Sequence, residues 1–194
     1  MSKSDPNAAK KQRNKTIRWV LTIFFVTILV SGTISLVSDL IMEASTMTVA
    51  FIILLVIVML GILFDIIGVA VTSADEKPFH SMAARKVPGA QEAIRLLRNA
   101  ERVSSICNDV VGDICGVVSG SASATIAAQV ISAAEFTWPQ MISLLMSALV
   151  AGLTVGGKAI GKTFAIGSCT KIVHTAGRFI WAFRNFPAFL RRKK

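Results

Sequence analysis

The sequence predicts an all-α integral membrane protein with four transmembrane helices, amphipathic juxtamembrane helices, and both termini in the cytoplasm. The composition predicts the membrane: 53% of the 194 residues are apolar and only 16% are charged, whereas an ordinary soluble domain has about 25% charged residues. The apolar residues also form runs of the ~20 residues that cross a bilayer. The distribution of Lys and Arg predicts the orientation.

The first apolar run covers residues 19–42 and follows a polar, basic stretch of 18 residues, which we expect to be a disordered tail. A secretory signal peptide is the competing interpretation of such a beginning. However, the run is longer than the apolar region of a signal peptide, and no small-residue cleavage site follows it. We therefore expect a retained first transmembrane helix.

Three more spans are predicted over residues 47–74, 103–134 and 139–167. The second span follows the first after about four residues, so the two should form a tight antiparallel hairpin. The third span consists of small and polar residues rather than Leu and Phe. Glycines recur every four residues in the last two spans, a spacing that permits close helix packing, at Gly112, Gly116 and Gly120 and at Gly152, Gly156, Gly157 and Gly161.

Two charged segments flank these spans. In residues 75–102, Ala93, Ile94 and Leu97 fall near helical spacing while Arg95 and Arg98 form another face, which predicts an amphipathic helix on the membrane surface. Residues 168–194 alternate aromatic and basic side chains, and we expect the aromatic ones at headgroup level. Anionic lipid headgroups are the partners that this charge favours, and they explain it without nucleic acid.

The basic residues fix the topology of the four spans. No Lys or Arg occurs in residues 19–76 or 103–157, so the net charge of +10 is carried by the tail, the middle loop and the end of the chain. With four spans these three regions lie on the same side. The positive-inside rule places them in the cytoplasm, which predicts a multi-pass protein of the cell membrane.

Charged side chains inside the spans are the candidate functional residues: Asp65, Asp109, Asp113 and Lys158. A charge near the bilayer centre costs at least ~2.5 kcal/mol, and such groups usually find a partner inside the bundle. Asp109 and Asp113 are four residues apart on one helix face, so they repel unless a metal ion, a proton or Lys158 lies with them. Asn108 adds a neutral oxygen, which suits Mg²⁺. A static charge network that fixes helix packing is the alternative interpretation.

Three segments in order resemble the transmembrane domain of the CorC/CNNM family of magnesium transporters. FDIIGVAVTSADEKPFHSMAARKVPGAQEAIRLLRNAERV resembles the first helix and juxtamembrane helices of the family, VGDICGVVSGSASATIA resembles its second helix, and GGKAIGKTFAI matches the spacing of its third. The resemblance covers about residues 48–185 and implies the family's membrane domain over 43–185, a homodimer and a cation pocket. The helix at 19–42 is extra, and the family's CBS domains are not expected here.

The departures from the family pattern leave two hypotheses. Lys158 stands where the family has a Glu, and Gly161 replaces a Pro. In the first hypothesis the protein moves Mg²⁺ or another cation, Lys158 is a gate or displaceable counter-ion, and the ion's ligands are Asp65, Asp109, Asp113 and Asn108. In the second, Lys158 neutralises the Asp pair permanently and the protein is a membrane scaffold. We do not expect an enzyme or a bound cofactor other than the candidate Mg²⁺, because His80 and His174 lack a paired nucleophile.

Overall fold

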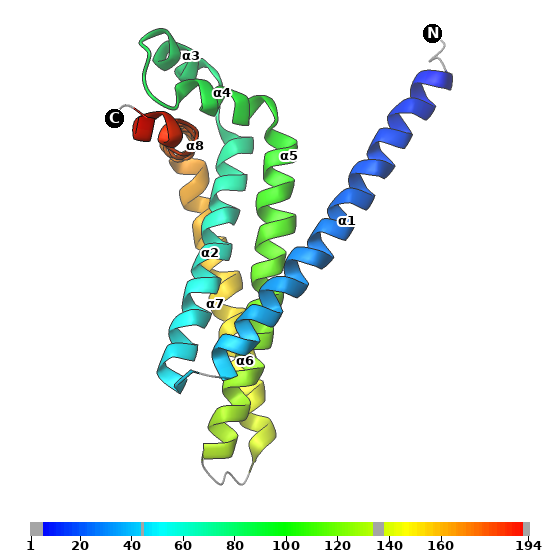
Figure 1. Cartoon of the computed structure of the whole chain (residues 1–194), viewed down its shortest axis with the longest axis vertical. Helices are drawn as coiled ribbons and strands as arrows, with labels where there is room; N and C mark the ends of the chain where they lie inside the picture. Colours follow the sequence, from blue (N-terminus) through cyan, green and yellow to red (C-terminus); the bar gives the residue numbers. More distant parts are fainter. Residues whose placement is uncertain (1–5, 44, 134–137, 192–194) are drawn as a thin grey trace.

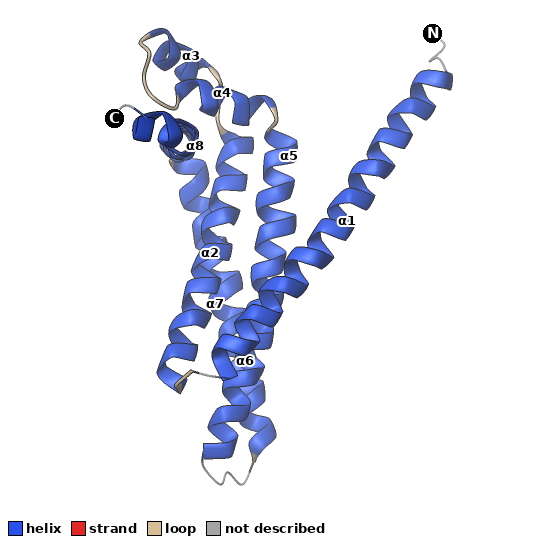
Figure 2. Cartoon of the chain, in the orientation of Figure 1, coloured by secondary structure: helices blue, strands red, loops and turns tan. Residues whose placement is uncertain are grey.

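The computed structural model describes residues 6–43, 45–133 and 138–191, with side chains described over 16–41, 45–133 and 138–185. The described part is almost entirely helical and contains no strand (Figure 2). The first five residues of the predicted tail and the last three residues of the basic C-terminal segment lie outside it, as does the side chain of Phe186.

The four predicted spans are confirmed as helices long and apolar enough to cross a membrane, over Thr16–Ile41, Met47–Ser73, Ala100–Ala133 and Pro139–Gly167 within the described residues. The first lies in α1 (Pro6–Glu43), the second is α2 (Met47–Ser73) and the fourth is α7 (Pro139–Gly167). The third consists of three consecutive pieces: α5 (Ala100–Ser105), the π-helix η1 (Ile106–Gly112) and α6 (Asp113–Ala133). The protein is therefore a multi-pass membrane protein.

Helix α1 differs from the prediction at its start and in its packing. It begins at Pro6, so residues 6–18, which we expected to be disordered, continue the helix. The short connection to α2 is as predicted, yet α1 packs mainly against α6 and crosses it obliquely (Figure 1). Ser121 Oγ on α6 donates a hydrogen bond of 3.3 Å to Asp39 Oδ1. Nearer its start, α1 meets the third span again, because the Arg102 guanidinium lies 5.4 Å from the centre of the Trp19 ring.

Helix α2 is the centre of the bundle, because it contacts η1, α6 and α7. Small residues permit these contacts: a Cβ added to Gly61 would lie 2.9 Å from Cys115 Cβ, and one added to Gly161 would lie 2.8 Å from Ile66. The predicted glycine repeats are thus used only in part. Gly112, Gly157 and Gly161 lie at helix contacts, whereas a Cβ would meet nothing within 4 Å at Gly116, Gly120, Gly152 and Gly156.

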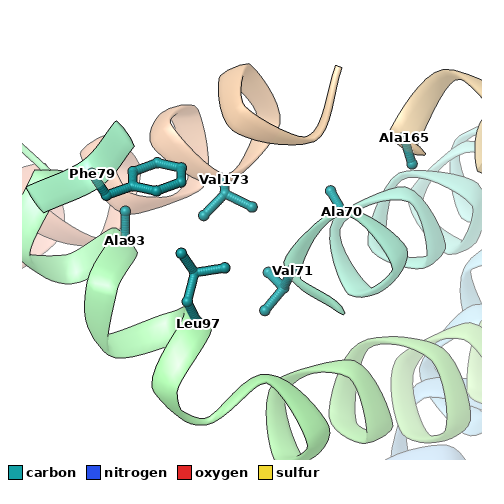
Figure 3. Close-up of a cluster of buried hydrophobic side chains, with 7 residues drawn as sticks. All are labelled: Ala70, Val71, Phe79, Ala93, Leu97, Ala165 and Val173. Atoms are coloured by element: carbon teal, nitrogen blue, oxygen red, sulfur yellow. The ribbon is translucent and has the colours of Figure 1, made fainter. Parts of the chain in front are cut away.

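Three helices cover the end of the bundle where α2 and α7 stop: α3 (Lys77–Ala84), α4 (Ala90–Arg98) and α8 (Cys169–Arg191). After Ser168 the chain turns, and α8 runs across the bundle beside α3 and α4 (Figure 1). The side chains of Phe79, Ala93, Leu97 and Val173 meet there and pack with Val71 of α2 (Figure 3). We had expected the apolar residues of α4 to face the membrane. Ala93 and Leu97 instead pack against protein, because α8 returns to cover them.

The contact between Gly61 and Cys115 predicts a specific stability effect. Gly61→Ala should lower the free energy of unfolding by about 1–3 kcal/mol, because the methyl group meets a Cβ that is fixed to the facing backbone. The thermal midpoint of the purified protein in detergent measures this loss. Gly116→Ala is the matched control, since it adds the same group to open space, and equal midpoints for the two variants would contradict the proposed contact.

Candidate functional site

A π-helix interrupts the third span at the residues proposed as cation ligands. Residues Ile106–Gly112 adopt the wider turn, and Asn108 and Asp109 lie within it. π-helical turns are rare and occur frequently at functional sites, because the extra residue in the turn redirects side chains. Hydropathy and charge spacing did not predict this feature.

Asp65 lies on the face of α2 that contacts η1. It stands between Gly61 and Gly68, and residues three and four apart share a helix face. A Cβ at Gly68 would overlap the Asn108 side-chain amide, and one at Gly61 would lie near Cys115. Asp65 is therefore directed into the same contact between α2 and η1, and it is only 4% exposed.

Two buried oxygens in this contact lack a hydrogen-bond partner among the described residues: Asp65 Oδ2 and Asn108 Oδ1. The Asn108 amide nitrogen is occupied, because Nδ2 donates to Ser104 Oγ at 3.3 Å. A carboxylate oxygen and an amide oxygen both accept and neither donates. A buried charge without a partner is strongly unfavourable, so a bound cation or a proton would satisfy this pair.

Lys158 brings a positive charge close to the same contact. Its Nζ would lie 3.4 Å from a Cβ on Gly112, and the carbonyl oxygen of Gly112 faces Gly61, one helical turn from Asp65. Within the described part of the chain, however, the ion pairs closer than 4.0 Å all lie outside the spans and none includes Lys158. The Lys158 ammonium thus lies about one helical turn from the level of Asp65 and forms no ion pair with the Asp65 carboxylate.

The other two predicted carboxylates differ from Asp65 in their exposure. Asp109 and Asp113 are both exposed, whereas Asp65 is buried. Across the described residues no group of three or more His, Cys, Asp and Glu side chains is close enough to hold a metal ion. Asp65, Asn108 and Lys158 therefore form the candidate site, and Asp109 and Asp113 form a second charged surface on the third span.

Asp39 is an intramembrane carboxylate that the sequence analysis overlooked. It accepts the hydrogen bond from Ser121 and attaches α1 to α6. The sequence could have identified Asp39 as a candidate, because it is a single acidic residue inside a span and acidic residues are rare there.

No protein-family model, curated protein or solved structure matches this chain. The chemistry of the site is therefore inferred from its own residues, and the resemblance to the CorC/CNNM family carries over only as a proposal.

The unpartnered carboxylate of Asp65 predicts that its neutral isostere is more stable when no metal is present. Asp65→Asn should stabilise the fold by about 1–3 kcal/mol, because the amide removes a buried charge that has no partner among the described residues. The thermal midpoint at pH 8 in the presence of a chelator measures the gain.

Asp75→Asn is the control for this measurement, because it removes the same charge from an exposed position outside the spans. A midpoint that falls in Asp65→Asn, or rises equally in both variants, would show that the Asp65 carboxylate is not an isolated buried charge.

Proposed function

We propose that the protein is a cation transport protein of the cell membrane, of CorC/CNNM type, with both termini in the cytoplasm. The buried carboxylate of Asp65 carries this proposal, together with the unpartnered oxygen of Asn108 in the same contact between α2 and η1. The absence of Lys and Arg from two loops supports the orientation. The substrate is a hard cation, and Mg²⁺ is the one that the resemblance implies.

The chemistry of the pair suits such an ion. Mg²⁺ prefers oxygen ligands, keeps several waters, and is usually bound through one or two carboxylates. Asp65 supplies one charged oxygen and Asn108 one neutral oxygen, so a partly hydrated ion needs no larger set of protein ligands. A small number of protein ligands also makes it easier for the ion to leave the site, which transport requires.

Lys158 is the charge-compensating group in this proposal. The lysine ammonium is a compact charge on a flexible four-carbon stem, so from its place near Gly112 it can reduce the unfavourable energy of the buried carboxylate when no ion is bound and move away when one arrives. Its position near Gly112, one turn from Asp65 along the bundle, fits this role.

The exposed carboxylates support a homodimer. Charged residues within spans almost always face a bundle interior or a water-filled cavity rather than lipid. Asp109 and Asp113 are nevertheless exposed on the single chain. We propose that a second copy covers this surface and that the two carboxylates line a polar path between the protomers, leading to Asp65.

Ion uptake by the purified protein in liposomes tests the transport proposal. Asp65→Asn should lower the rate of Mg²⁺ uptake at least about tenfold, since changes around a metal site cost about 10–100-fold in affinity or activity. Ca²⁺, Mn²⁺ and Na⁺ measured in parallel define the selectivity. Asp75→Asn, which removes a carboxylate outside the spans, should leave uptake unchanged, and normal uptake in Asp65→Asn would eliminate the proposed site.

A membrane scaffold is the second candidate, favoured by the position of the Lys158 ammonium, which would lie 3.4 Å from a Cβ on Gly112 of η1. Lys158→Gln separates the two functions. If Lys158 is a displaceable counter-ion, its removal should raise the apparent Mg²⁺ affinity and leave the thermal midpoint nearly unchanged. If it fixes the bundle, the midpoint should fall by several degrees, and neither the wild-type protein nor the variant should take up ions.

A further inference from the structure

A polar cavity of about 360 Å³ lies at the α3–α4 end of the molecule, between α4, the turn that joins α3 to α4, and the middle of α8. Its volume falls in the range of small-molecule sites. Three cationic side chains line it, together with Glu92, Trp181 and Asn185. The three cations are Lys86, Arg95 and Arg184.

A close backbone contact forms the cavity. Gly89 has a left-handed φ of 84°, and a Cβ there would lie 2.5 Å from the backbone nitrogen of Arg178. Gly177 also leaves no space for a side chain, since a Cβ added there would lie 2.5 Å from the Gly89 carbonyl oxygen. These two glycines hold the start of α4 against α8 and so bring Arg184 to the same cavity as Arg95.

The cavity has an excess of positive charge. Glu92 is 8% exposed and is shared by two guanidiniums, at 3.5 Å from Arg184 and 3.8 Å from Arg95. The Lys86 ammonium has no ion-pair partner within the described residues. One carboxylate thus balances only part of three positive charges, which favours an anionic ligand with several acceptor oxygens.

The cavity and the exposed apolar face of α8 lie on different sides of this helix. Trp181 and Arg184, three residues apart, share the face that lines the cavity. Phe179 and Phe183, four residues apart, share another face and are 76% and 81% exposed. With about 100° per residue, Trp181 points nearly opposite to Phe179. If the Phe face enters the bilayer, the cavity lies on the headgroup side of α8, next to the aqueous phase.

We propose that this cavity is a phosphate-binding site, which holds either the phosphate of an anionic lipid headgroup or a soluble phosphate. Lys86 contributes a point charge, Arg95 and Arg184 contribute planar donors that match phosphate oxygens, and Trp181 closes one side. The site is distinct from the Asp65 site and binds a ligand of opposite charge.

Two binding measurements on the purified full-length protein test the proposal and identify the source. In the first, the thermal midpoint in detergent is compared in inorganic phosphate and in KCl of equal ionic strength. In the second, native mass spectrometry counts the phosphatidylglycerol retained from mixed micelles with phosphatidylcholine. A phosphate-dependent rise assigns a soluble ligand, and selective retention of phosphatidylglycerol assigns a lipid.

Lys86→Gln should weaken whichever ligand binds by about fivefold, the contribution of one basic residue near a membrane surface. The double variant Lys86→Gln/Arg95→Gln should weaken it further. Arg85→Gln is the matched control, since Arg85 is the exposed neighbour of Lys86 and does not line the cavity. Lys86→Gln leaves both Glu92 ion pairs in place, so its effect does not come from breaking them.

The proposal is overturned if neither probe binds the wild-type protein, or if Arg85→Gln weakens binding as much as Lys86→Gln. Neither readout involves ion uptake. Failure here leaves the Asp65 site intact, and loss of uptake in Asp65→Asn leaves the phosphate site intact.

Discussion

The buried carboxylate of Asp65 is the constraint on which the bundle depends. Inside a membrane no bulk water satisfies a polar group, so each one requires a partner from the protein or a bound ion. Asp65 is 4% exposed and one of its oxygens has no partner in the described structure. The π-helical turn of η1 presents Asn108 to the same contact, and Lys158 approaches it from α7. The three side chains have to be considered together, because each is a polar or charged group in a region where lipid provides no hydrogen-bond partner.

Close packing and the polar site are made by the same residues. Gly61 and Gly68 flank Asp65 on α2, and each lets a group of η1 or α6 approach α2 closely. A larger side chain at Gly68 would displace the Asn108 amide, and one at Gly61 would move the third span away. The geometry of the site is therefore set by helix–helix distance rather than by a flexible loop. An ion bound at the proposed site between α2 and η1 would have to move these helices, so its binding would be energetically linked to their packing.

The sequence predicted the parts of the structure that follow from hydropathy and charge. The four spans and the short α1–α2 connection follow from the length of the apolar runs, and Asp65 was found because a charge in a span is costly. The helical spacing of Ala93 and Leu97 revealed an apolar face but not what covers it, because the return of α8 is a long-range contact. Likewise, spacing could not reveal that Asp109 and Asp113 are exposed, since that depends on how η1 and α6 are rotated against α2. Asp39 was predictable by the rule that found Asp65.

In the proposed cation site, Lys158 and a divalent ion would compete for the carboxylate of Asp65, and this competition would set the affinity for the ion. If the ammonium neutralises Asp65 in the ion-free state, an incoming cation must displace it, and the measured affinity is the difference between the two interactions. A lysine stem that is free to move away from Gly112 would make this exchange energetically easy, whereas a stem fixed by packing would make it very unfavourable. The Lys158 Nζ lies near Gly112 rather than in an ion pair with a carboxylate. An ammonium already one turn from Asp65 has less interaction energy to lose, so this geometry favours the displaceable counter-ion over the permanent one.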